Sequence, residues 1–157
     1  MMRVVPREEL SQLGERLRSN NLRIVFTNGC FDLLHVGHLR YLQQARELGD
    51  LLVVGVNTDA GVRRLKGPSR PLVSEDERAE LLAGLRCVDY VTLFDEATPV
   101  ETIRALKPHV HVKGGDYREE DLPEAAAVRE GGGEVKIMPL VPGRSTTDLV
   151  RKIVGDA

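Results

Sequence analysis

The chain has 157 residues, of which 41% are apolar and 29% are charged, and its net charge is −2. This length and balance predict a folded domain with its own hydrophobic core and exclude a disordered chain. The small net charge and the 4% content of aromatic residues argue against a broad surface for nucleic acid or anionic membrane and against a base-stacking platform.

Helical and strand patterns alternate along the first third of the chain. Leucines at helical spacing form an apolar stripe in residues 7–19, which predicts an amphipathic helix. The longest apolar run, over 51–56, is typical of a strand in a parallel sheet covered on both faces, and it is too short to span a bilayer. The predicted elements of this part are a helix over 7–19, a strand over 23–27, a helix over 36–48 that stops at Gly49, and a strand over 51–57.

The same alternation continues to the end of the chain. Residues 58–73 are rich in Gly, Pro and basic residues, and they predict a short helix over 60–65 followed by an exposed loop over 66–71. Ser74 begins the next helix, because residues 74–77 fit a capping box. The remaining predicted elements are that helix to residue 85, a strand over 90–94, a helix over 99–106, a strand over 110–113, a helix over 123–130, a strand over 134–138 and a helix over 146–154.

Strands that alternate with helices predict an α/β fold, here a single Rossmann-like domain with a parallel five-stranded sheet covered by helices on both faces. We expect one domain over 1–157, with an N-terminal helical segment over 1–21 and a core over 22–154. In such sheets ligands bind beyond the carboxyl ends of the strands, near the point where strand order reverses. The glycine-rich or basic segments after the first, second, fourth and fifth strands should therefore converge on one face.

Two histidines three residues apart, His35 and His38, lie where the chain passes from the first predicted strand into the next predicted helix. Backbone N–H groups and the positive end of the helix dipole meet there, and both favour phosphate. At i and i+3 the two imidazoles project to the same side and can reach neighbouring oxygens of one polyphosphate. Gly29 permits a tight turn, and Gly37 lets phosphate approach the backbone. The alternatives are two surface histidines that cap a helix, or a zinc site, for which no third ligand is evident nearby.

Three further segments add cations, glycines or hydroxyls at predicted strand ends. Residues 63–71, followed by Arg78, form a basic loop that could neutralise a triphosphate; the alternative is a solvated basic loop. Residues 113–117 expose backbone donors through two glycines, although for this segment alone an ordinary turn is the favoured interpretation. Residues 143–147 place hydroxyls at the start of the last helix, which suits phosphate or a plain Ser/Thr cap.

Cysteine usage and the amino-terminal residues indicate the cellular setting. Cys30 and Cys87 lack metal-ligand spacing, and residues 1–21 are charged and lack an apolar leader, so we expect reduced thiols in a cytoplasmic protein. A redox role for Cys30 is an alternative to simple packing. His109 and His111 alternate along a predicted strand and are expected to be sheet-face residues.

Taken together, these segments resemble the HxGH nucleotidyltransferase superfamily, in particular its cytidylyltransferase-like branch. Residues 26–35 with Gly37 and His38 are shared with the wider branch. More specific marks resemble the adenylyltransferases that make ADP-heptose, a lipopolysaccharide precursor; that unit occurs alone or fused behind a sugar kinase domain. These marks are residues 56–59, 64–67, 69–71, 112–117 and 143–147.

The resemblance implies a nucleotidyltransferase domain that moves AMP from ATP to heptose 1-phosphate, with Mg²⁺ accompanying ATP, small-molecule substrates and a homodimer. The implied catalytic residues are His35, His38 and Lys66. The implied nucleotide-binding residues are Thr27, Asn28, Gly29, Cys30, Phe31, Gly37, Lys113, Gly114, Asp116, Ser145 and Thr146. The implied acceptor-binding residues are Asp32, Arg70, Tyr117 and Arg144, and no protein metal ligand is implied.

Two other functions are compatible with the same motifs. One is a cytidylyltransferase that uses CTP and a small alcohol phosphate such as glycerol 3-phosphate; those enzymes carry an arginine where this chain has Leu140. The other is a non-catalytic nucleotide-sensing module. Arg144 stands where the superfamily often has isoleucine, which leaves its role open.

Overall fold

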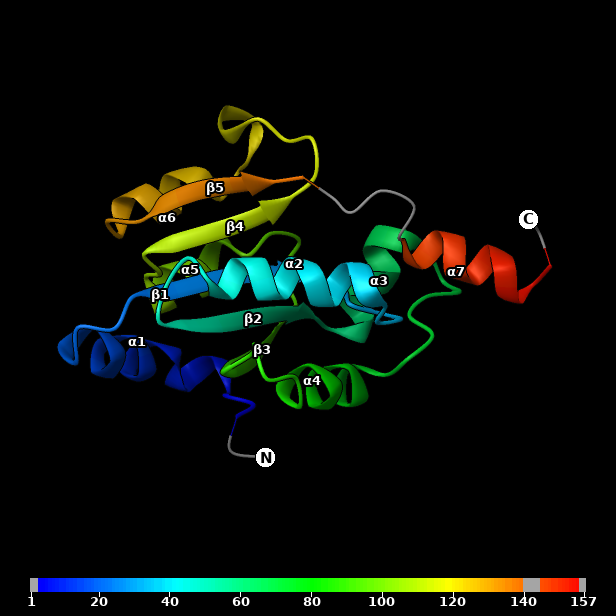
Figure 1. Ribbon diagram of the computed structural model, residues 1–157, viewed down its shortest axis with the longest axis horizontal. Coiled ribbons are helices and arrows are strands. Elements are labelled where there is room, and N and C mark those ends of the chain that lie inside the picture. Colours follow the sequence, from blue (N-terminus) through cyan, green and yellow to red (C-terminus); the bar gives the residue numbers. More distant parts are fainter. Residues whose placement is uncertain (1–2, 140–144, 156–157) are drawn as a thin grey trace.

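Five parallel strands form one sheet in the computed structural model, which describes residues 3–139 and 145–155 (Figure 1). The strands are β1 (Ile24–Gly29), β2 (Leu51–Asn57), β3 (Tyr90–Phe94), β4 (Val110–Gly114) and β5 (Glu134–Met138). Their spatial order is β3-β2-β1-β4-β5, and every neighbouring pair is parallel. The predicted α/β fold with a five-stranded parallel sheet is confirmed.

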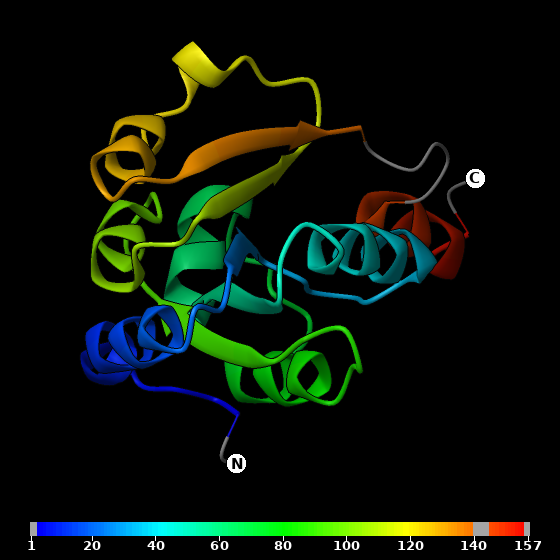
Figure 2. The same cartoon turned by 60° about the vertical axis from the view of Figure 1, so that its left-hand side comes forward.

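Helices cover both faces of this sheet (Figure 2). The described helical segments are η1 (Arg7–Glu9), α1 (Leu10–Ser19), α2 (Val36–Arg46), α3 (Asp59–Lys66), α4 (Glu75–Ala83), α5 (Val100–Leu106), η2 (Glu119–Asp121), α6 (Ala125–Glu130) and α7 (Thr146–Ile153). On one face α2 and α4 pack with Val25, whereas on the other α1, α5 and α6 pack with Ile24 and Phe26. Successive residues of β1 thus serve opposite core layers, as the two-residue period of a strand requires. None of the helices in the described residues is long and apolar enough to cross a membrane.

Element ends differ from the predictions more than element positions do. β2, β3 and β5 have the predicted bounds. β1 extends to Gly29, because Asn28 and Gly29 stay in register with Gly55 and Val56 of β2. The predicted first helix opens as the 3₁₀ turn η1, and α2 already ends at Arg46.

The order of strands reverses between β1 and β4, and the two strands part soon after they meet. β1 pairs with β4 only through Val25 and Phe26. One step further on, the Val112 carbonyl of β4 accepts hydrogen bonds from the hydroxyls of Thr27 (2.9 Å) and Tyr41 (3.1 Å). Side chains thus replace the backbone ladder here, and the strands separate into a crevice at the topological switch point.

Candidate active site

A cavity of about 380 Å³ lies over the carboxyl ends of β1 and β4, where strand order reverses. Its size suits a small-molecule ligand. The predicted site residues in its lining are His35, His38, Lys66, Asn28, Gly29, Cys30, Phe31, Gly37, Lys113, Gly114, Ser145, Thr146, Asp32, Arg70 and Tyr117. Segments distant in sequence therefore meet at one pocket, as their places at strand ends predicted.

Two predicted residues in the described part of the chain are not in this lining, and a third cannot be placed. Thr27 is fully buried, and its hydroxyl bonds inside the fold, so it shapes the crevice from below. Asp116 is exposed outside the lining, and Arg144 lies outside the described residues. Tyr41 and Thr147 line the pocket without having been predicted.

The two predicted catalytic histidines form the start of α2. Nδ1 of His35 accepts a hydrogen bond from the Gly37 N–H (3.1 Å), and Nδ1 of His38 accepts one from the His35 N–H (3.2 Å). Together they make a reciprocal capping box in which imidazoles replace the usual hydroxyl and carboxylate. Since each Nδ1 is an acceptor, each neutral ring carries its proton on Nε2 and can donate there. Capping and phosphate binding are thus compatible roles, assigned to different nitrogens of the same rings.

His38 acts as an uncharged donor near neutral pH. Burial, together with the neighbouring His35 and Lys66, lowers the pKa of His38 to about 4. Its ring lies 3.9 Å from that of His35 between centroids and 5.4 Å from that of Phe31. His38 therefore adds no positive charge to the pocket near neutral pH, and Lys66 lines the same pocket.

The sharp turn after β1 is made by Phe31, and the role predicted for Gly29 needs correction. Gly29 is the last residue of the strand, whereas Phe31 adopts a left-handed backbone with φ of 49°. A side chain at Gly29 would approach the Phe31 ring to 3.0 Å. Gly29 is needed because this ring folds back onto it.

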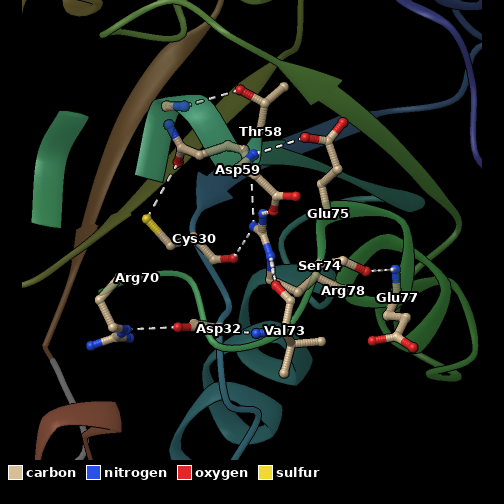
Figure 3. A network of polar contacts seen from close by, with 12 residues as sticks. Cys30, Asp32, Thr58, Asp59, Arg70, Val73, Ser74, Glu75, Glu77 and Arg78 are labelled. Carbon is tan, nitrogen blue, oxygen red and sulfur yellow. Dashed lines mark hydrogen bonds and ion pairs between the residues drawn. The ribbon is translucent and has the colours of Figure 1, made fainter. Parts of the chain in front are cut away.

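A buried carboxylate anchors the loop that follows α3, which ends at Lys66 (Figure 3). Asp32 accepts hydrogen bonds from the backbone N–H groups of Leu72 and Val73, both at 2.9 Å, and from Arg70 Nε at 2.7 Å. Burial alone would raise the pKa of Asp32, but these three donors outweigh it and hold the pKa below the ordinary value. Asp32 therefore stays ionised and fixes the loop against the end of β1.

Arg78 is buried and holds several segments together through hydrogen bonds. The prediction that grouped it with the cations of the exposed loop is wrong. Its guanidinium, 1% exposed, donates to three carbonyls and a carboxylate at 2.7–2.8 Å (Figure 3). The acceptors are the carbonyls of Val73, Cys30 and Asn57 and the carboxylate of Asp59. One cation thus ties the ends of β1 and β2 to the loop. The available signal was its place on the apolar stripe of α4, next to Ala79.

Two polar atoms in the pocket wall are buried and lack a hydrogen-bond partner among the described residues. They are Nη2 of Arg70 and Oδ1 of Asn28. Asp32 already orients Arg70 through Nε, so Nη2 presents a positively charged donor of the kind that binds phosphate. Across the crevice Lys113 Nζ lies 5.0 Å above the Tyr117 ring. The pocket is therefore lined by one basic residue from the segment after β2, Arg70, and by one from β4, Lys113.

The start of α7 completes the pocket. Ser145 caps this helix, because its hydroxyl accepts from the Asp148 N–H at 3.0 Å, so the plain-cap alternative is correct for that bond. The Thr146 hydroxyl donates to the Leu33 carbonyl at 3.4 Å, which seats α7 against the segment before α2. Both residues also line the cavity.

The site offers little support for thiol or metal chemistry by the protein itself. Burial raises the pKa of the Cys30 thiol, whose sulfur faces Asn57 Oδ1 at 3.8 Å, so the nucleophilic thiolate is disfavoured. Among the described residues no group of three or more His, Cys, Asp or Glu could hold a metal ion. Asp32 is the one carboxylate among the described lining residues, and its oxygens already accept from the loop and Arg70.

Comparison with known proteins shows which family the chain resembles. The pattern of the cytidylyltransferase-like family matches residues 26–152. Two similar curated proteins are named bifunctional protein HldE. That of Trichlorobacter lovleyi is 55% identical over 94% of this chain and 30% of its own length, and that of Koribacter versatilis is 56% identical over 96% and 31%. The chain thus spans about a third of the length of these relatives.

A solved structure shows the same arrangement of elements. The lipopolysaccharide core biosynthesis protein from Thermoplasma volcanium aligns with a TM-score of 0.64 and 31% identity, over 76% of this chain and 97% of its own. The structural match and the family pattern each cover most of the chain. The chain belongs to the cytidylyltransferase-like family.

Proposed function

We propose that this chain is a nucleotidyltransferase that transfers AMP from ATP to heptose 1-phosphate and releases pyrophosphate, giving ADP-heptose. The observation that carries the proposal is the pair of histidines that cap α2 through Nδ1 and line one pocket together with Lys66 and Lys113. Membership of the cytidylyltransferase-like family supports nucleotidyl transfer. The named relatives and the lipopolysaccharide-related neighbour favour heptose 1-phosphate as the acceptor.

The reaction needs no general base, because the attacking phosphate oxygen is already anionic. That oxygen forms a bond to the α-phosphorus, while the bond from the α-phosphorus to the bridging oxygen breaks and pyrophosphate leaves with the electron pair. Orientation of two bound reactants can supply roughly 7–11 kcal/mol of the barrier. The dipole of α2 contributes only about 0.3–1 kcal/mol, so the side chains must provide most of the charge stabilisation.

In this proposal each wall of the pocket handles one part of the triphosphate. His35 and His38 donate from Nε2 to oxygens of the transferred phosphate, and Lys66 neutralises the charge that develops on the leaving group. Ser145 and Thr146, at the start of α7, bind the far end of the triphosphate. Residues at the end of β4 contact the nucleotide.

The acceptor phosphate fits the Arg70 side of the pocket. Nη2 of Arg70 is the donor aimed at it, and Asp32 contributes by holding Arg70 in place. Tyr117 and Arg144 stay predicted acceptor contacts. Magnesium that arrives with ATP would take its ligands from phosphate oxygens and water, since the described lining offers it no spare carboxylate.

A screen of nucleotides against acceptors tests the proposal. Pyrophosphate release is measured with ATP or CTP, each combined with heptose 1-phosphate or glycerol 3-phosphate. We expect the fastest release with ATP and heptose 1-phosphate. Fastest release with CTP and glycerol 3-phosphate would replace the proposal with a cytidylyltransferase. Nucleotide binding without release in any combination would identify a sensing module.

We also propose that residues 1–157 act as one domain and assemble as a homodimer. Limited proteolysis should leave the core intact, and light scattering should give twice the chain mass of 17.4 kDa. A monomer that keeps full activity would remove the dimer from the proposal.

A further inference from the structure

One buried carboxylate lies behind the β4 wall of the pocket and plays no part in the chemistry described so far. Glu124, at the amino end of α6, is 2% exposed. Its Oε2 accepts from His111 Nε2 at 3.2 Å and lies 3.9 Å from Lys113 Nζ. A buried charge is costly unless it is paired and hydrogen-bonded, so these two partners explain why Glu124 is tolerated there.

The three residues meet because of strand geometry. His111 and Lys113 are two residues apart on β4 and therefore project from the same face of the sheet. His111 is fully buried and stacks on Phe26 of β1 with ring centroids 5.6 Å apart, whereas the Lys113 side chain is 23% exposed and lines the pocket. Glu124 thus links a fixed group in the core to a cation at the site.

This link restrains a side chain that is otherwise flexible. Lys113 Nζ contacts both the Glu124 carboxylate and the face of the Tyr117 ring, 5.0 Å from its centroid. The bond from His111 in turn orients the carboxylate. Burial alone would raise the pKa of Glu124, but the hydrogen bond from His111 and the charge of Lys113 lower it, so the carboxylate is charged at neutral pH.

We propose that Glu124 is a positioning residue, which places the Lys113 ammonium at the β4 wall for the incoming triphosphate nucleotide. The inference rests on the proposed nucleotidyl transfer, but it concerns nucleotide affinity and can be tested without knowing the acceptor. Supporting groups that fix a binding side chain from behind are a general requirement of precise sites.

The test is a double-mutant cycle read by calorimetric affinity for ATP, and for CTP in parallel. Glu124→Gln keeps the shape of the side chain and removes its charge. We expect it to weaken nucleotide binding by about two- to tenfold, which is the lower part of the range of coupling between contacting residues. In a Lys113→Ala background the same change should have no further effect on affinity, because its target is gone.

Two controls separate positioning from simple stabilisation. Glu134→Gln removes the exposed carboxylate of β5 that pairs with Arg23 at 3.3 Å, and it should leave nucleotide affinity unchanged. Glu124→Asp retains the charge with a shorter reach, so it should weaken binding less than Glu124→Gln does and remains informative if the glutamine variant folds poorly. Thermal unfolding of each variant reports its stability.

The outcomes are distinct. Loss of affinity that depends on Lys113 supports the proposal. An equal loss in both backgrounds, or a lowered Tm with unchanged affinity, overturns it and leaves Glu124 a structural partner of His111. Tight nucleotide binding without pyrophosphate release would count against the proposed function while the Glu124 cycle could still be read.

Discussion

Two pairs of histidines in this chain show how location decides what the same side chain does. His35 and His38 use Nδ1 to cap the start of α2, with the rings beside the pocket. His109 also uses Nδ1 as an acceptor, from the Ile24 N–H at 2.9 Å, and His111 bonds a buried carboxylate. The first pair follows a strand's carboxyl end, whereas the second lies at the start of β4 and within it. One histidine of the second pair thus accepts from a backbone N–H through Nδ1, as both of the first pair do. The difference is that His35 and His38 line the pocket, whereas His109 and His111 are not among its described lining residues.

The strongest way to break this comparison is to remove Nε2 of His35 while keeping its cap. Asparagine is a good N-cap residue, so His35→Asn should preserve α2. We expect turnover, measured as pyrophosphate release, to fall by about 100-fold or more, as for loss of one donor to a transition-state oxyanion. His109→Ala is the matched control, and its turnover should stay within about twofold while its Tm falls. Equal losses in the two variants would refute the distinction.

The charge assigned to Lys66 gives the next largest effect. Because His38 is neutral at working pH, the pocket depends on cations, and Lys66→Ala should lower turnover by more than about tenfold. Lys136→Ala removes an exposed lysine from β5 and should change little. A loss of turnover below threefold for Lys66→Ala would show that the loop takes no part in catalysis.

Arg70 sharpens the comparison on the acceptor side. Arg70→Ala should raise the KM for the acceptor phosphate by about tenfold, the loss expected for one charged hydrogen bond, with a smaller effect on the KM for ATP. Arg104→Ala, which removes a surface pair with Glu101 on α5, is the control. A rise confined to the KM for ATP would move Arg70 to the nucleotide side.

The smallest effect concerns pH. His38 should titrate with a midpoint near 4 when its ring proton is followed by NMR. Its folded pKa lies below the ordinary value of 6.5, so the unfolded chain binds more protons between these values. The stabilising contribution of His38 is therefore complete above pH 6.5 and is lost as the pH falls toward 4. A His38→Asn variant should show a weaker fall in Tm over this window, and a midpoint near 6.5 in the parent protein would contradict the assignment.

Local patterns were sufficient for most of the fold and for the motifs of the site. β2 has its predicted bounds because its apolar run ends at polar residues that also end the strand. The end of β1 could not be placed from local pattern, since Asn28 and Gly29 are held by pairing with β2. The histidine motif was recognisable because two side chains three residues apart at a helix start must share a face.

Contacts between segments that are distant in the sequence could not be predicted from sequence patterns. Arg78 was grouped with the loop because a charged residue seldom occupies a core position, yet carbonyls from two strand ends satisfy it there. Glu124 gave no signal, because its partners on β4 come from a different part of the chain. The neutral state of His38 likewise depends on burial, which spacing does not reveal.

In the capping box of α2, His35 combines a structural role with the proposed role in activity, and only the first can be taken over by another residue. Asparagine or serine at position 35 would make an ordinary helix cap, and selection for stability alone would accept such a change. The same change would remove the Nε2 donor from the pocket. Stability screens of this chain should therefore enrich inactive variants at position 35, and a screen for activity is needed to keep the histidine.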